Sequence, residues 1–195
     1  MHKQAKILSE KNIKLVLSHL ESTRYPVRNK IIVLLSLHGL RAKEISAVTW
    51  SMVIDADGQV DTKLELHNNA TKGKCGGRVI FLSTQLRALL IVYKQDILPL
   101  ALSPIVRSER GCPMTAATIA NWFGNLYRQV GLIGASSHSG RRTFITKAAK
   151  KIVEAGGSLR DVQILAGHKH LSVTQRYIEQ DNAAQRKVVG LVCDY

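Results

Sequence analysis

The chain has 195 residues, of which 45% are hydrophobic, and this composition excludes a largely disordered protein because a core can be buried. A formal net charge of +14 points to a polyanionic partner, most simply a nucleic acid. The apolar run at residues 31–35 is far too short to span a bilayer, and no basic amphipathic terminus is present, so no membrane partner is expected.

The N-terminal part of the chain predicts three helices. Ser9 can cap a helix that runs to about residue 19, because apolar residues recur there at helical spacing. A strongly apolar helix follows Pro26 and stops at Gly39, and a short helix covers residues 42–48. No apolar secretory core precedes these helices, so we expect an intracellular, soluble protein of the cytoplasm.

Three short segments that follow, residues 50–54, 60–66 and 78–82, are predicted to be strands. They are separated by the turn-forming residues 55–58 and by the glycine-rich residues 72–77. A small antiparallel sheet is therefore expected in this part of the chain.

The remainder is predicted to be helical with interruptions. One helix covers about residues 86–93, and a second covers about residues 115–130 with Trp122, Phe123 and Leu126 in the core. The later helices are expected at residues 141–155, at 158–165 after a Ser158 cap, and around Tyr177 after a Ser172 cap. The fold class is thus mainly α with a small antiparallel β-sheet (α+β), and residues 1–195 are predicted to form one domain.

The cysteines give no sign of a metal site or of disulfides. Cys75, Cys112 and Cys193 are odd in number and far apart, and no Cys-x-x-Cys pair is present. We expect thiols in a reducing compartment.

Charged and aromatic residues near three of these helix ends carry the functional signal. Arg41 opens a helix on which Glu44 lies one turn away on the same face, and alone this is an ordinary surface ion pair. His138 and Arg141 lie where a loop becomes a helix, so both can face one point near amides that favour an anion. Tyr177 would by itself be a half-buried core residue.

A last motif places His168 directly after Gly167 at a helix end, where a histidine alone would be read as a cap. In this order, the motifs resemble those of the catalytic domain of tyrosine recombinases, the phage integrase family. That family shows an arginine segment, a His-x-Leu-Arg pattern, and Leu-x-Gly-His followed by a tyrosine. Here Gly140 replaces the leucine, which affects local packing more than chemistry. The resemblance covers residues 8–178.

The resemblance implies the recombinase catalytic-domain fold and a role for each motif. Tyr177 would attack a DNA phosphate and form a 3′-phosphotyrosine link, which conserves bond energy and can be reversed by a DNA hydroxyl. Arg41, Arg141 and His168 would stabilise the charge on the phosphate, to which the planar arginine fork is suited. Glu44 would support the site and His138 would assist proton transfer. No metal, ATP or other cofactor is implied.

The family draws the proton for the leaving oxygen from a lysine on a β-hairpin tip. Lys72 and Lys74 both lie in the predicted hairpin, and Lys72 is preferred because it follows a threonine, as in many relatives. Besides Lys74, two arginines beside the motifs, Arg142 and Arg176, are predicted to contact DNA.

These implications predict a site-specific recombinase or integrase that breaks and rejoins duplex DNA, nucleoid-associated and of bacterial or phage origin. Two alternatives are a type IB topoisomerase-like nicking and closing activity and a non-catalytic DNA-binding regulator with the same fold. The usual N-terminal core-binding domain, which completes a clamp on DNA, is not expected within this chain. We expect a monomer when DNA is absent and a synaptic tetramer on DNA, and the tail at residues 178–195 docks on a neighbour or folds back on its own domain.

Overall fold

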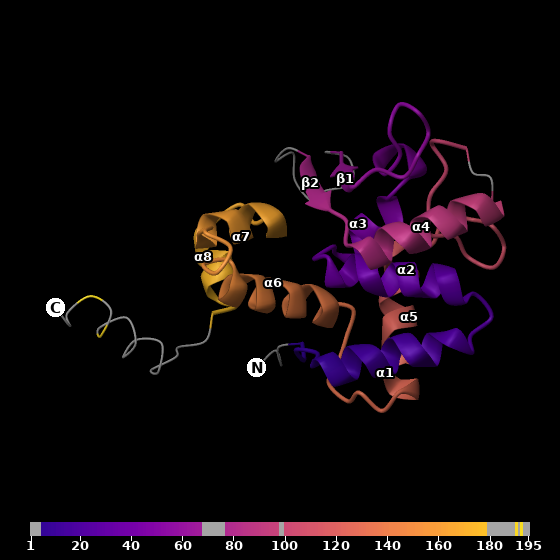
Figure 1. Ribbon diagram of the computed structural model, residues 1–195. Coiled ribbons are helices and arrows are strands. Elements are labelled where there is room, and N and C mark those ends of the chain that lie inside the picture. The colour runs from indigo at the N-terminus through magenta and orange to yellow at the C-terminus, as the bar shows by residue number, and fades with distance from the viewer. Residues whose placement is uncertain (1–4, 68–76, 98–99, 179–189, 191, 193–195) are drawn as a thin grey trace.

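The computed structural model describes residues 5–67, 77–97, 100–178, 190 and 192 of the chain. It is mainly helical with one small antiparallel sheet, which confirms the predicted fold class (Figure 1). The elements follow in this order: α1 (Glu10–Glu21), α2 (Pro26–Leu37), α3 (Ala42–Ala47), the 3₁₀ helix η1 (Trp50–Met52), β1 (Lys63–Leu66), β2 (Arg78–Phe81), α4 (Thr84–Ile97), α5 (Ala116–Gln129), α6 (Ser139–Lys151), α7 (Leu159–Ala166) and α8 (Leu171–Gln175).

Helix α2 is the centre of the fold. Residues 31–35 of this helix are all buried, so it is apolar on every side rather than along one stripe. Helices α1, α3, α4 and α6 all contact it (Figure 1). Pro26 begins the helix with a backbone angle that suits a first turn, and Gly39, with φ of 87°, turns the chain toward α3.

Among the described residues the sheet has two strands, where the sequence predicts three. Strands β1 and β2 pair in antiparallel register, with Lys63 opposite Phe81 and Leu66 opposite Arg78. The predicted strand at residues 60–66 is shorter than expected, since the ladder starts at Lys63.

The predicted strand at residues 50–54 is wrong. Residues Trp50–Met52 form η1, and the Trp50 side chain is fully buried. The amides of Trp50 and Ser51 donate to the carbonyls of Ser103 and Ala101, at 3.1 and 2.7 Å. These bonds to a distant loop occupy the first two amides of the predicted strand, and at its end Ile54 makes an isolated antiparallel bridge to Val60.

Helices α6 and α8 have other ends than predicted, whereas α7 follows its predicted Ser158 cap. Helix α6 begins and ends earlier than residues 141–155, and Val153, which lies beyond its end, is exposed. Helix α8 begins after His170 rather than at Ser172, and Tyr177 lies just beyond its last residue. Among the predicted core residues of α5, Phe123 and Leu126 are buried and Trp122 is partly buried. The predicted tail at residues 178–195 falls almost entirely outside the described residues.

The buried apolar side chains form two clusters. The large one contains Trp50 and Phe123 and joins α1 to α5 with the sheet, and the small one is centred on Ile145, Val162 and Ala166 of α6 and α7. Helix α6 contacts both α2 and α7, and α7 and α8 lie at its far end, away from the other helices (Figure 1). The functional motifs come from both sides of this division.

Candidate active site

Arg41 and Glu44 form the first part of the site at the start of α3. The backbone amide of Arg41 donates to Glu44 Oε2 at 2.7 Å, and its Nη1 donates to Oε1 at 2.9 Å. Glu44 is buried with 1% of its side chain exposed, whereas one third of the Arg41 side chain is exposed. One carboxylate thus both caps the helix and holds the arginine beside it.

Arg141 lies in the first turn of α6 and is almost fully buried. Its Nη1 donates to the carbonyl of Gly39, and its Nη2 donates to the carbonyl of Ala166 at 2.6 Å. Burial, and then the charges of Arg41 and Arg78, lower the pKa of Arg141 to about 9, so it remains charged at neutral pH. The two carbonyls fix the plane of its guanidinium group.

His168 follows the end of α7, where Gly167 adopts the left-handed conformation with φ of 61°. Its Nδ1 lies 2.9 Å from the hydroxyl of Thr174. Burial first, and then the nearby arginines, led by Arg141, lower the pKa of His168 to about 4. The imidazole is therefore neutral at pH 7 and can offer a hydrogen bond but no positive charge.

Tyr177 is placed against His168 by the turn that follows α8. The two rings stack, with centroids 5.7 Å apart and an interplanar angle of 23°. The amide of Tyr177 donates to the carbonyl of Thr174 at 3.0 Å. Since the hydroxyl of Thr174 also meets His168, one buried threonine sets the relative position of the histidine and the tyrosine.

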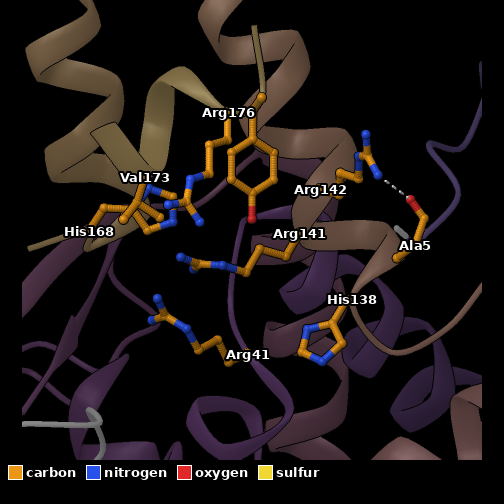
Figure 2. A pocket seen from close by; sticks show the side chains of 9 residues that line it. Ala5, Arg41, His138, Arg141, Arg142, His168, Val173 and Arg176 are labelled. Carbon is orange, nitrogen blue, oxygen red and sulfur yellow. Dashed lines mark hydrogen bonds between the residues drawn. The ribbon is translucent and has the colours of Figure 1, made fainter. Parts of the chain in front are cut away.

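These side chains border one pocket of about 400 Å³. Figure 2 shows the guanidinium groups of Arg41 and Arg141 pointing to the side of the pocket where His168 lies. No carboxylate lines the pocket among the residues that the structure describes. The residues that line it are Ala5, Arg41, His138, Arg141, Arg142, His168, Val173, Arg176 and Tyr177.

Three other predicted site residues, His138, Arg142 and Arg176, also line the pocket, but their side chains lie in different directions. His138 precedes α6 and lies on the side of the pocket away from His168, with its side chain exposed (Figure 2). Arg142 is turned away toward Ala5, and its Nη1 donates to the Ala5 carbonyl at 2.9 Å (Figure 2). Arg176 is exposed at the pocket edge. The predicted lysines, Lys72 and Lys74, lie outside the described residues.

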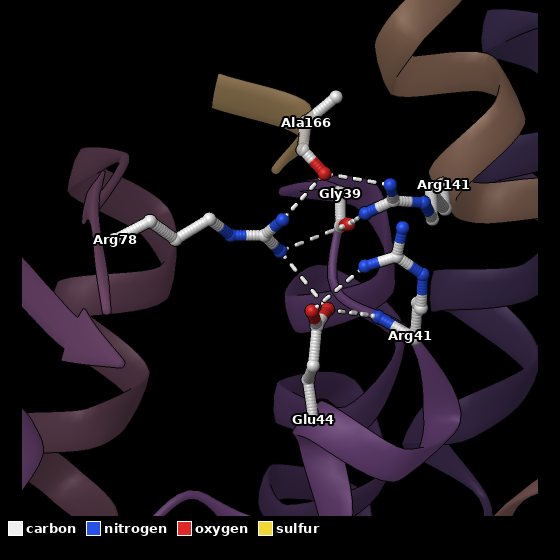
Figure 3. A network of polar contacts seen from close by, with 6 residues as sticks. All are labelled: Gly39, Arg41, Glu44, Arg78, Arg141 and Ala166. Atoms are coloured by element: carbon white, nitrogen blue, oxygen red, sulfur yellow. Dashed lines mark hydrogen bonds and ion pairs between the residues drawn. The ribbon is translucent and has the colours of Figure 1, made fainter. Parts of the chain in front are cut away.

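One residue of the site, Arg78, was not singled out from the sequence. Its side chain is only 7% exposed, and its Nη2 pairs with Glu44 Oε2 at 2.9 Å (Figure 3). Arg78 shares its strand face with the buried Ile80 rather than with the exposed Val79. Because Val79 and Phe81 are apolar although they are exposed, the sequence itself shows no alternation that would have placed Arg78 toward the interior.

Two other kinds of feature, a metal-binding cluster and a membrane-spanning helix, are absent from the described residues. No three of their histidine, cysteine or acidic side chains are grouped in a way that could hold a metal ion. No helix in the described ranges is long and apolar enough to cross a membrane.

The arrangement is suited to an anion with a nucleophile beside it. Two oriented guanidinium groups, the start of α6 and a neutral imidazole all face one pocket, and each can bind or donate to negative oxygens. The phenol of Tyr177 borders the same space. Such a set can stabilise a phosphorus centre whose charge rises while the phenol oxygen attacks it.

Comparison with known proteins agrees with this chemistry. The model of the phage integrase family matches residues 6–184. The tyrosine recombinase XerC of Rickettsia bellii (strain OSU 85-389) is 33% identical over 181 residues, which cover 88% of this chain and 55% of the relative. XerC of Rickettsia prowazekii (strain Madrid E) is 32% identical over 161 residues, or 78% of this chain and 47% of the relative. The chain thus spans about half the length of these curated relatives.

Solved structures share the fold. The integrase of the Tn1549 transposon, in complex with transposon right end DNA, superposes with a TM-score of 0.75 at 17% identity, covering 98% of this chain and 67% of that one. The crystal structure of XerA recombinase gives a TM-score of 0.69 at 20% identity, covering 98% of this chain and 64% of that one.

Proposed function

This chain belongs to the phage integrase family, and from that membership we propose that it is a site-specific tyrosine recombinase that breaks and rejoins duplex DNA. The observation that carries the proposal is the pocket in which Arg41, Arg141 and Tyr177 meet. The curated relatives matched over the same residues are tyrosine recombinases.

The reaction starts with Tyr177. Its phenol loses a proton, its oxygen forms a bond to the phosphorus, and the bond from phosphorus to the 5′ oxygen breaks, which leaves a 3′-phosphotyrosine. Arg41 and Arg141 hold the nonbridging oxygens, and His168, being neutral, donates a hydrogen bond rather than a charge. A 5′ hydroxyl of another strand then attacks the phosphotyrosine and restores the phenol.

Two proton transfers accompany this exchange. His138 lines the pocket with an exposed imidazole, which suits it to assist proton transfer. The leaving 5′ oxygen takes its proton from a lysine, for which we propose Lys72 ahead of Lys74 on the basis of the sequence pattern. Glu44 takes no part in these transfers, since both of its oxygens accept from arginines.

The substrate and the assembly follow from the same proposal. The net charge of +14 favours duplex DNA as the partner, which would place the protein with the nucleoid. Arg176, exposed at the pocket edge, is proposed to contact a phosphate. Strand exchange needs two duplexes, so we propose a tetramer on DNA and a monomer without it. Sedimentation with and without a target duplex tests this, and a concentration-independent dimer without DNA would contradict it.

Covalent trapping tests the activity. Duplexes enriched from a random-sequence pool by binding to the 195-residue chain are nicked near the centre, so that the short strand with its 5′ hydroxyl diffuses away after cleavage. We expect an adduct that survives denaturation and that is lost in Tyr177→Phe. Tight binding without an adduct would instead support a non-catalytic regulator, and relaxation of supercoiled plasmids without any target site would support a topoisomerase.

A further inference from the structure

Arg78 connects three segments of the site that are distant in the sequence. Its Nη1 donates to the carbonyl of Ala166 at 2.5 Å, and its Nη2 lies 3.4 Å from the carbonyl of Gly39 and 2.9 Å from Glu44 Oε2. Gly39 precedes the arginine segment, and Ala166 ends the helix before His168. Figure 3 shows this guanidinium group facing that of Arg141 across the two carbonyls.

The three arginines have different hydrogen-bond partners. Both carbonyls receive donors from Arg78 and from Arg141, whereas the carboxylate receives Arg78 on one oxygen and the Nη1 of Arg41 on the other. Because Glu44 Oε2 accepts from Arg78 and from the amide of Arg41, the Arg41 side chain pairs with Glu44 through one nitrogen only. The rest of its fork is left to face the pocket that it lines.

The glycine of the Leu-x-Gly-His motif fits this arrangement. A Cβ at Gly167 would collide with Nη1 of Arg78 and would lie 3.1 Å from its Cδ. Gly167 therefore meets two demands, a left-handed backbone at the end of α7 and room for the Arg78 side chain. Arg78 of β2 thus packs against Gly167 and fixes the position of this glycine, which directly precedes His168.

We propose that Arg78 is a positioning residue that sets the geometry of Arg41 and His168 for attack on the phosphate. It does not line the pocket itself, so it acts through Glu44 and through the carbonyl of Ala166. This inference rests on the proposed recombinase function and adds a residue to it.

Removing the guanidinium group has a specific consequence. In Arg78→Gln, Glu44 keeps Arg41 as its one charged partner among the described residues, so the Arg41 fork is drawn toward both carboxylate oxygens and away from the pocket. The Ala166 carbonyl loses one of its two donors at the same time. We expect the first-order rate of adduct formation at saturating DNA to fall roughly 10- to 100-fold, as small misplacements of catalytic groups do. The Kd for the same duplex should change little, because Arg78 is buried.

Arg28→Gln is the matched control. Arg28 is a similarly buried arginine, with bonds to the Asn29 side chain at 2.8 Å and to the carbonyl of Arg107 at 3.0 Å, and it lies outside the pocket. Its loss should lower the melting temperature but leave the rate per active molecule unchanged. Arg78→Lys should recover part of the rate, because an ammonium group can still pair with Glu44 but cannot bridge to the Ala166 carbonyl.

A spectroscopic readout separates positioning from simple loss of stability. Arg78 is one of the cations that hold the pKa of His168 below its ordinary value. Titration of the His168 ring by NMR should therefore give a higher pKa in Arg78→Gln than in Arg28→Gln or the wild-type chain. This titration needs neither DNA nor activity.

The outcomes distinguish the two proposals. A wild-type chain that forms no adduct defeats the recombinase function, while the His168 titration still tests whether the charge of Arg78 acts on His168. A wild-type chain that forms the adduct, with Arg78→Gln reacting at the same rate or Arg28→Gln slowed equally, overturns the positioning role. If Arg78→Gln does not fold, Arg78→Lys decides the question, and a wild-type rate in that variant together with an unchanged His168 titration would refute the inference.

Discussion

Three arginines, Arg41, Arg78 and Arg141, lie close to a single buried carboxylate, that of Glu44. Arg41 and Arg78 pair with Glu44, whereas Arg141 donates only to the carbonyls of Gly39 and Ala166 among the described residues. The group therefore holds an excess of positive charge at low exposure, which is costly unless an anion compensates it. The proposed DNA phosphate would supply that anion, so the positive charges that repel one another in the site would favour its binding.

Replacing Arg141 with lysine separates charge from geometry. An ammonium group keeps the charge but cannot hold two carbonyls and a phosphate oxygen in one plane. We expect Arg141→Lys to slow adduct formation roughly 100- to 1,000-fold, while affinity for the target duplex falls far less. Single-turnover trapping together with a binding titration measures both quantities, and a rate close to that of the wild type would show that charge alone suffices.

The depressed pKa of His168 makes the folded state sensitive to acid. The unfolded histidine takes up a proton near pH 6.5 and the folded one only near pH 4, so the unfolded state binds more protons between these values. The free energy of unfolding therefore decreases as the pH falls from 6.5 toward 4, by on the order of 3 kcal/mol from this group. Denaturant titrations should show a smaller decrease in His168→Gln than in the wild type.

A control for this titration is the exposed His67. The variant His67→Gln should keep the pH dependence of the wild-type chain. If the free energy of unfolding changes equally with pH in the wild type, His168→Gln and His67→Gln, His168 is already protonated, or is solvated, in the folded state at neutral pH.

At the scale of the elements, the close crossing of α6 over α2 explains the glycine that replaces the leucine of the family pattern. A Cβ on Gly140 would lie 2.9 Å from the Cβ of Ser36 in α2 and would collide with its Oγ. The two helices therefore approach more closely at this point than a larger residue permits. Since Arg141 is the next residue, this crossing also sets how far Arg141 reaches toward the Gly39 carbonyl.

Widening this crossing should disturb both stability and catalysis. We expect Gly140→Ala to lower the free energy of unfolding by about 1–3 kcal/mol, because α6 must shift from α2 to accept the methyl group, and to slow adduct formation. Gly124→Ala in α5 is the control, since its added Cβ would meet nothing within 4 Å. That change should be neutral or stabilising, by up to about 1 kcal/mol. Urea denaturation measures the free energy of unfolding of both variants. An equal decrease in Gly140→Ala and Gly124→Ala would show that the close crossing of α6 and α2 does not matter.

The elements also show what the sequence could and could not predict. The start of α1 depends on neighbouring residues, and the predicted Ser9 cap is confirmed by its bonds with Asn12 at 3.1 and 3.2 Å. The strand expected at Trp50 is absent because its amides bind a loop some fifty residues later. Local patterns therefore predict helices well, and they fail where a distant segment takes the backbone bonds.

Arg78 could not be predicted as a site residue, because its partners are distant in the sequence. The predicted site residues Arg41, Arg141, His168 and Tyr177 meet in one pocket, because family motifs carry long-range geometry that single residues do not. Arg78 lies outside those motifs, and its partners Glu44 and Ala166 are 34 and 88 residues away in the sequence. No local pattern distinguishes such a residue from a solvated arginine at the start of a strand.

At the scale of the whole molecule, the charge of +14 predicts that the affinity for duplex DNA falls steeply as the salt concentration rises. The positions of the arginines predict which of them contribute to this dependence. Arg176 is exposed beside the pocket, whereas Arg142 is held by the carbonyl of Ala5 at 2.9 Å. Arg176→Gln should reduce the slope of log Kd against log salt by about 1. Arg142→Gln should leave the slope unchanged. Binding titrations over a range of salt concentrations measure both, and equal changes would show that Arg142 also reaches a phosphate.

The pocket lies across the boundary between the two apolar clusters, and we call this boundary the seam. Arg41 comes from the side of the large cluster, and His168 and Tyr177 come from the side of the small one, which has three fully buried apolar residues in the described part of the chain. Because so little apolar surface is buried there, α7 and α8 should open more often than α2, and their amides should exchange with solvent faster.

A ligand that touches both sides of the seam should close it. Binding of a target duplex is expected to slow amide exchange in α7 and α8 more than in α2, because a phosphate held by Arg41 and His168 joins the two parts. Hydrogen exchange followed by mass spectrometry measures this, with Arg41→Gln as the variant in which the duplex still binds but the link across the seam is lost. If α7 and α2 exchange equally slowly without DNA, the seam is already closed, and the phosphate cannot be what assembles the site.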